Sequence, residues 1–307
     1  MIQSGIDEAG LGPILGPYCG ASTSFEYNGV IKDPRKSCSS ILSKEPGNKH
    51  LAVGDSKKIY TSGKLKVLEK TVLAFYELFT GEKAENAESF IQTLSGQSLP
   101  GEIPWYTNIK ALTLPLSYKL DQEKGQQPVD SLKIALTGAG ITIKSLKLTV
   151  QPAEEFNRLL NKTCNKATVC QEILSPLLKS AVSLSDQVVV DRQGGRRYYG
   201  DWLVSLFPGK RLNALRELKE LSRYKMENCL IDFQVKADAL CFETALASMF
   251  AKYSRELCMT AFNSYWNSLS PGIKKTAGYY SDGQRFIKDL QERGCFPENP
   301  DLLIRKK

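Results

Sequence analysis

Histidine is almost absent from this sequence, and its scarcity argues against several classes of enzyme chemistry. His50 is the only histidine among 307 residues, which argues against histidine-ligated zinc sites and histidine-dependent nucleophilic triads. The eight cysteines are scattered without a C-x-x-C pair, so we expect reduced thiols and neither a disulfide framework nor a zinc site. A metal site in this chain would be built from carboxylates, and ligation by oxygen alone favours magnesium or manganese.

Long apolar runs are also missing. No run reaches the roughly 18 residues that a membrane helix needs, and the N-terminus lacks the basic-then-apolar layout of a secretory signal. We therefore expect a cytoplasmic protein that does not bind membranes. Hydrophobic residues make up 42% and charged residues 24% of the chain, as in globular proteins with a sizeable core. The net charge of +8 suits a polyanionic partner such as nucleic acid.

Strand-like and helix-like segments are intermingled along the chain, which predicts the α/β class. The strands are recognised as short apolar runs and the helices by apolar residues at three- and four-residue spacing. The first expected strand ends at residue 6, and the others cover 18–25, 141–150, 187–190 and 229–235. The expected helices begin at about 65, 152, 166 and 239.

Four carboxylates follow predicted strands. Asp7 and Glu8 lie in a turn rich in glycine and proline, Asp191 ends the apolar run 187–190, and Asp238 separates a strand from a long helix. Functional groups gather where the strands of α/β sheets end. Two divalent ions would neutralise four converging acids and support in-line phosphodiester hydrolysis. Taken singly, each acid is also typical of a solvated turn or a helix N-cap.

Several motifs occur in an order that a known family shares. The chain opens with Gly5-Ile6-Asp7-Glu8-Ala9-Gly10-Leu11-Gly12-Pro13, and Gly16-Pro17 follows. This opening resembles that of ribonuclease HII. Further blocks resemble the same family in the expected order: Asp55-Ser56-Lys57-Lys58, Val188-Val189-Val190-Asp191, Lys236-Ala237-Asp238, Ala251-Lys252-Tyr253-Ser254-Arg255-Glu256 and Gly278-Tyr279.

The resemblance implies a ribonuclease-H-like fold, with a mixed five-stranded sheet flanked by helices in a single catalytic domain over 1–307. It implies a metal-dependent endoribonuclease that cuts the RNA strand of RNA/DNA hybrids or of duplexes containing ribonucleotides. Asp7, Glu8, Asp191 and Asp238 would be catalytic and would hold two Mg²⁺ or Mn²⁺ ions. The implied substrate-binding residues are Gly10, Leu11, Gly12, Ser56, Lys57, Lys58, Lys252, Arg255 and Tyr279. Nothing in the sequence indicates an obligate protein partner.

The chain also departs from the family pattern. Leu11 stands where the family has an arginine between two glycines, and leucine lacks the charge and the five donors of a guanidinium. Gln284 stands where the family has a histidine. Two insertions are expected: 81–140, with little regular structure, and the basic segment 192–228. A helical C-terminal part is expected over 239–307.

The basic segment 192–228 combines arginines with aromatic residues. Arg196 and Arg197 precede Tyr198 and Tyr199, a pattern that suits phosphate contact together with base stacking. The same segment is equally typical of a solvated amphipathic helix over about 211–224. Two alternatives to hybrid cleavage therefore stay open: a nucleic-acid-binding protein of the same fold that does not cut, and a nuclease acting on DNA or structured RNA.

Overall fold

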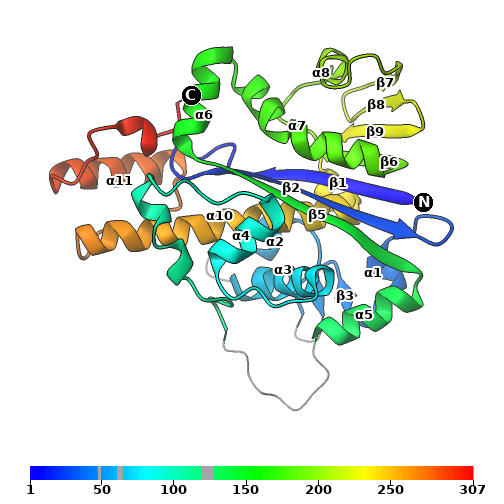
Figure 1. The fold of residues 1–307 in the computed structure, drawn as a ribbon, viewed down its shortest axis with the longest axis horizontal. Coiled ribbons are helices and arrows are strands. Elements are labelled where there is room, and N and C mark those ends of the chain that lie inside the picture. The colour runs from blue at the N-terminus through cyan, green and yellow to red at the C-terminus, as the bar shows by residue number, and fades with distance from the viewer. Residues whose placement is uncertain (48–49, 61–64, 119–127, 307) are drawn as a thin grey trace.

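A mixed seven-stranded sheet forms the centre of the molecule. The computed structural model describes residues 1–47, 50–60, 65–118 and 128–306 (Figure 1). The strand order across the sheet is β5-β2-β1-β6-β9-β8-β7. β1 pairs with β6 and β6 with β9 in parallel, while the other neighbours are antiparallel. The strands are β1 (Ile2–Ala9), β2 (Tyr18–Tyr27), β5 (Ile141–Gln151), β6 (Gln187–Asp191), β7 (Leu212–Glu217), β8 (Leu221–Met226) and β9 (Cys229–Gln234); β3 (Leu42–Ser43) and β4 (Leu51–Ala52) form a separate pair.

The α/β class and the mixed sheet are confirmed, but the predicted number of five strands is wrong. Five strands, β5, β2, β1, β6 and β9, correspond to the predicted ones, and the hairpin β7–β8 extends the sheet beyond β9. The alternative helix over about 211–224 is therefore also wrong. The open edge of β9 provides backbone hydrogen bonds for β8, and the buried Tyr224 of β8 packs edge-on against Phe233 of β9. This tertiary pairing overrides a local pattern compatible with a helix.

Helices cover both faces of the sheet. Figure 1 shows α6 and α7 on one face and α3, α4 and α10 on the other. Each layer encloses its own group of buried side chains, one with Phe156 and Leu174, the other with Phe75 and Phe250. The helices are α1 (Pro34–Ser37), α2 (Ser56–Ile59), α3 (Leu65–Thr80), α4 (Ala87–Ser95), α5 (Pro128–Gly138), α6 (Ala153–Thr163), α7 (Lys166–Leu184), α8 (Gly200–Leu206), α9 (Ala237–Leu240), α10 (Phe242–Leu269) and α11 (Tyr280–Glu292), with short 3₁₀ turns at Pro104–Tyr106, Ile109–Ala111 and Pro300–Leu302.

The predicted insertion 81–140 contains more regular structure than expected. It includes α4 and α5 as well as two 3₁₀ turns, while residues 119–127 lie outside the described residues. Asn86 caps α4 by accepting from the backbone N–H of Ser89 at 2.9 Å, and Ser89 returns the bond. The four buried residues of α4 pack it against the main helical layer. The expectation of little regular structure rested on the prolines in this segment, which do not reveal the capping box that begins α4.

The long helix α10 crosses β1 at very close range. Gly5 permits this approach, because a Cβ at that position would lie 2.1 Å from the backbone nitrogen of Thr244. Thr244 donates from its hydroxyl to the carbonyl oxygen of Val189 at 3.0 Å, which fixes α10 to β6 as well. The helix is thereby held under the strand ends that carry the acids. In the described part of the chain, no helix is long and apolar enough to cross a membrane.

Candidate active site

Two parallel strands bring Asp7 and Asp191 together. β1 and β6 are in register at Ile6 and Val190, so the next residues along the two strands are neighbours. Ile6 and Val190 are buried on the side of α6 and α7, and alternation along a strand directs the two acids toward α10. Asp7 is only 6% exposed, and its own carboxylate accepts from the backbone N–H of Glu8 at 2.6 Å. Contrary to expectation, Asp7 and Glu8 lie within β1 itself and not in the turn after it.

The crowding of acids changes their protonation. Burial raises the pKa of Asp7 well above its usual value, and the charges of Asp191 and Glu8 raise it further. A hydrogen bond with Ser248 on α10 acts in the opposite direction. Burial, followed by the charge of Asp191, raises the pKa of Glu8 to about 7. Each of the three groups therefore resists ionisation while the others are charged.

Asp238 lies at the far side of the same group. Burial raises the pKa of Asp191 to about 6, the charge of Asp238 raises it too, and the backbone N–H of Ala237, donating at 2.8 Å, lowers it. The short helix α9 begins after Lys236, which has a left-handed φ of 56°, and this turn aims Ala237 back at β6. Burial also raises the pKa of Asp238, as does the charge of Asp55. The four predicted acids thus form a chain of interacting carboxylates.

One lysine offsets much of this negative charge. Lys57 lowers the pKa values of Glu8, Asp191 and Asp238. It stands in the first turn of α2, where Asp55 is the N-cap and accepts from the backbone N–H of Lys57 at 2.9 Å. The neighbouring Ser56 is buried, and its hydroxyl lies 2.9 Å from that of Ser248. Lys57 and Lys58 are both exposed, and it is the charge of Lys57 that acts on these carboxylates. Lys57 is therefore the residue of this block that faces the carboxylates.

The chemistry of the site fits a divalent cation. The oxygen Oε2 of Glu8 is buried without a hydrogen-bond partner, beside two further carboxylates whose pKa values are raised. A cation is the partner that satisfies such an oxygen and removes the repulsion. Among the described side chains as they stand, no group of three or more Asp, Glu, His or Cys could hold a metal ion. Binding of a metal ion would therefore require these carboxylates to move closer together.

The glycine turn after β1 is built for close backbone approach. Gly10 has a φ of 97°, and a Cβ there would lie 2.7 Å from the carbonyl oxygen of Pro17. Gly12 has open space around it. Leu11 is half-buried and packs against the apolar layer of α6 and α7. The turn is thus tightly packed at Gly10 and open at Gly12, while its central side chain packs against the protein.

Three predicted substrate contacts on or near α10 have different surroundings. Arg255 is 1% exposed and donates to the carbonyl oxygens of Leu15 at 3.1 Å and Ala277 at 2.9 Å, so in this arrangement it fastens the opening loop to the C-terminal part. Its Nη2 is thus used within the protein, and its predicted contact with substrate stays a prediction. Lys252 forms an ion pair with Glu256 at 3.1 Å. Tyr279 is 51% exposed, with the guanidinium carbon of Arg255 5.8 Å from its ring.

The predicted nucleic-acid contacts in the basic segment lie between β6 and α8. Arg196 is half-buried and donates to Oε1 of Gln171 at 3.4 Å, while Arg197 is exposed beside Tyr198, which is 64% exposed. The carbonyl oxygen of Arg197 accepts from the hydroxyl of Ser222 at 2.6 Å, which ties this loop to the β7–β8 hairpin. The segment starts directly after Asp191, the last residue of β6.

Arg305 is a site residue that the sequence motifs missed. It is 3% exposed, donates from Nη2 to the carbonyl oxygens of Gly10 and Pro13, and stacks 5.1 Å from the ring of Phe156. Its charge lowers the pKa of Glu8, and burial lowers its own pKa to about 10. Its backbone N–H donates to the carbonyl oxygen of Ile14 at 2.8 Å. No local pattern marks an arginine near the C-terminus as part of an N-terminal turn.

Solved structures relate this fold to known proteins. No model of a known protein family matches the sequence, and no curated protein matches it. A chain in the structure of the PCNA–RNase HII complex from Archaeoglobus fulgidus matches with a TM-score of 0.52 at 14% identity, over 100% of this chain and 95% of that chain. Ribonuclease H2 from Pyrococcus horikoshii matches with a TM-score of 0.46 at 14% identity, over 99% and 92%.

The first of these similarities establishes the class of the molecule. This chain has a ribonuclease-H-like α/β fold, as the order of its sequence motifs predicted. At 14% identity the likeness concerns the fold alone. What the acids at its strand ends do is a separate question of chemistry.

Proposed function

We propose that this protein is a divalent-metal-dependent endoribonuclease that hydrolyses the RNA strand of RNA/DNA hybrids. The observation that carries the proposal is the gathering of Asp7, Glu8 and Asp191 at adjacent strand ends, with raised pKa values and a buried oxygen of Glu8 that has no partner. A protein gains no stability from crowding like charges unless a cation joins them. Perturbed pKa values of this kind cluster at functional sites.

Asp7, Glu8, Asp191 and Asp238 would hold two ions, Mg²⁺ or Mn²⁺. Bound there, the ions would supply a strong nucleophile at neutral pH and offset the charge on the departing 3′ oxygen. Lys57, which already acts on three of the four acids, would contact the phosphate as a compact positive charge.

The remaining substrate contacts would come from the glycine turn and from exposed side chains. Gly10 and Gly12 would present backbone groups to a ribose 2′-hydroxyl, the group that distinguishes RNA from DNA. Tyr279 would stack on a sugar or base, since half of its surface is exposed. The products would carry 3′-hydroxyl and 5′-phosphate ends. Nucleic acid would be the principal partner, consistent with the net charge of +8.

A cleavage panel with Mg²⁺ and Mn²⁺ tests the proposal. The labelled substrates are a continuous RNA/DNA hybrid, duplex DNA with one embedded ribonucleotide, duplex RNA and duplex DNA. We expect metal-dependent cutting of the hybrid and little cutting at the single ribonucleotide, because Leu11 offers no guanidinium to the turn. A Leu11→Arg variant should improve cutting at the single ribonucleotide more than cutting of the hybrid. Cleavage of duplex DNA or duplex RNA alone would instead indicate a nuclease of altered substrate.

A second candidate is a nucleic-acid-binding protein that does not cut. The packing of Leu11 against the protein favours it, as does the absence, among the described side chains as placed, of a group ready to hold a metal. The same panel separates the two candidates. If no substrate is cut while binding stays tight and salt-sensitive, the binding function replaces the nuclease.

A further inference from the structure

One edge of the sheet is open and borders a cavity far from the acids in the strand order. β5 is the outermost strand, and within the described residues it pairs with β2 alone. Five consecutive residues, 147–151, line a cavity of about 710 Å³. Consecutive residues of a strand point to opposite faces, so a cavity lined by all five lies along the strand edge and not over one face.

Residues from helices on both faces of the sheet line the cavity beside this edge. Ile91 and Leu94 of α4, with Ile103, form the wall on one side. Leu159 of α6, with Ile173 and Leu177 of α7, forms the wall on the other side. Figure 1 shows that α4 and α7 lie on opposite faces of the sheet, with β5 between them. Of these six residues only Leu159 is more than 5% exposed, so a ligand at the edge would meet the backbone of β5 and the rims of the two sides.

We infer that this β5 edge groove binds an extended peptide as an additional antiparallel or parallel strand. The free backbone groups of an edge strand are a template for pairing. A peptide strand would direct alternate side chains to opposite faces, toward α4 on one side and toward α6 and α7 on the other. The five residues of β5 span about 17 Å, which sets a peptide core of about five residues.

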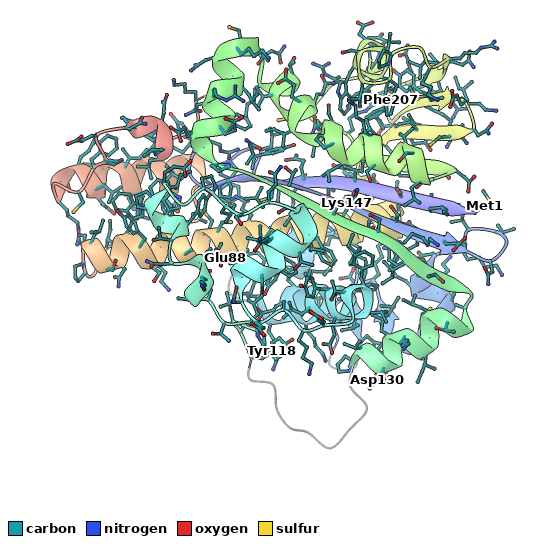
Figure 2. All side chains as sticks on the ribbon, viewed as in Figure 1. Met1, Glu88, Tyr118, Asp130, Lys147 and Phe207 are labelled. Atoms are coloured by element: carbon teal, nitrogen blue, oxygen red, sulfur yellow. The ribbon has the colours of Figure 1, made fainter. Side chains whose placement is uncertain are left out.

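The charges around the groove define the chemistry of that peptide. Four glutamates line it, Glu102, Glu154, Glu155 and Glu172, against one lysine, Lys147, which Figure 2 labels on β5. Only Glu155 among these four has an ion pair within the described residues, to the exposed Arg158. This acidic surface stands out on a chain of net charge +8. It repels nucleic acid and favours a peptide with lysine or arginine on either side of an apolar core.

The test uses synthetic peptides and the full-length chain. The probe is a fluorescein-labelled peptide with the core Val-Thr-Val-Thr-Val and two lysines at each end. One control peptide has the same side chains but N-methyl groups on alternate core amides, and the other has glutamates in place of the lysines. Binding is followed by fluorescence anisotropy. We expect dissociation constants of tens of micromolar for the probe, about tenfold weaker binding after N-methylation, and no binding of the glutamate-flanked peptide.

Matched variants locate the binding on the protein. Glu154→Gln combined with Glu172→Gln should weaken binding about fivefold, because two cation contacts are lost. Glu220→Gln combined with Glu298→Gln removes the same charge from exposed positions elsewhere and should leave binding unchanged. These measurements do not depend on nuclease activity, so the proposal stands or fails separately from the proposed function.

Three results would overturn the inference. The N-methylated peptide could bind as well as the probe, which would mean that strand pairing plays no part. No peptide could bind at 1 mM, a concentration well above the expected dissociation constants. Sedimentation could show a dimer that Glu154→Gln with Glu172→Gln disrupts, which would mean that a second copy of this chain occupies the groove.

Discussion

Two regions of the molecule differ in how deeply they are buried. One is the group of acids at the ends of β1 and β6, and the other is the β7–β8 hairpin with the loop that precedes it. The acids are buried, and residues from both ends of the chain surround them, since Arg305 lies under the turn that follows Glu8. In the hairpin, β7 is mostly exposed, whereas β8, which joins the sheet by pairing with β9, buries Ser222, Tyr224 and Met226. The exposed residues of the hairpin include leucines, Leu215 and Leu218 at 54% and 56% exposure.

This difference in burial indicates which of the two regions must be rigid. Groups that hold an ion must keep their positions against mutual repulsion, and only dense packing on all sides can enforce this. Cations that contact a flexible polyanion can stay solvated and still attract it, because the electrostatic attraction acts over the Debye length. Changes in the acids should therefore have large effects on chemistry and stability, whereas changes in the loop and hairpin should alter binding and its salt dependence.

The largest effect should come from Asp7→Asn. Removing this carboxylate should lower metal-dependent cleavage of the RNA/DNA hybrid by at least about a thousandfold, because a ligand shared by the ions is lost. Binding of the hybrid should change less than about threefold. Asp130→Asn, which removes an exposed carboxylate of α5 (Figure 2), is the matched control and should retain full activity. A fully active Asp7→Asn variant would remove Asp7 from the mechanism.

The next largest effect should come from Arg305→Ala. Loss of this buried side chain leaves the carbonyl oxygens of Gly10 and Pro13 without their donor and uncovers Phe156. We expect the free energy of unfolding to fall by about 2–4 kcal/mol, measured by urea denaturation. Arg305→Lys should recover part of the loss. Lys306→Ala, which removes an exposed side chain, should change little. If Arg305→Ala were as stable as the unchanged protein, Arg305 would not stabilise the turn at Gly10 and Pro13.

The metal-free protein should become less stable as pH rises toward neutrality. The pKa values of Glu8, about 7, and Asp191, about 6, are raised in the folded state above those of the unfolded chain. Their stabilising contribution is complete below the unfolded values and is lost as pH rises through the folded ones. We expect a loss on the order of 1–3 kcal/mol between pH 4.5 and 7.5, measured by denaturation in EDTA.

Two additions sharpen this pH experiment. Mg²⁺ or Mn²⁺ should restore the stability lost at pH 7.5, because ions bind the charged form of the acids. Asp7→Asn should flatten the profile in EDTA, since one of the repelling charges is gone. A metal-free protein whose stability rises from pH 4.5 to 7.5 would contradict the assignment of raised pKa values.

The smallest effect should come from the basic loop. Arg196→Ala combined with Arg197→Ala should weaken hybrid binding about three- to tenfold at 0.1 M salt and reduce the slope of log K against log salt by about 1–2. Lys110→Ala with Lys133→Ala removes two exposed cations elsewhere and is the matched control. An unchanged salt slope in the arginine variant would exclude the loop from the nucleic-acid contact.

Much of the fold was accessible from local patterns, and the failures have a common cause. The helix over 166–184 and the strands at 18, 187 and 229 follow directly from apolar spacing and runs. The β7–β8 hairpin was missed because its leucines recur every three residues, and only the open edge of β9 converts that pattern into strands. The roles of Asp7, Glu8, Asp191, Asp238 and Tyr279 all remain predictions, since position in the fold does not test chemistry.

The sequence by itself predicted the class of fold and that the four acids lie at or near strand ends, because motif order and apolar periodicity act over short stretches of chain. Only the tertiary structure decided that Arg255 is buried as a fastening between loops and that Arg305 reaches the turn at Gly10. Such contacts join residues more than two hundred positions apart. They depend on which surfaces the packed helices leave facing each other, and no local pattern encodes that choice.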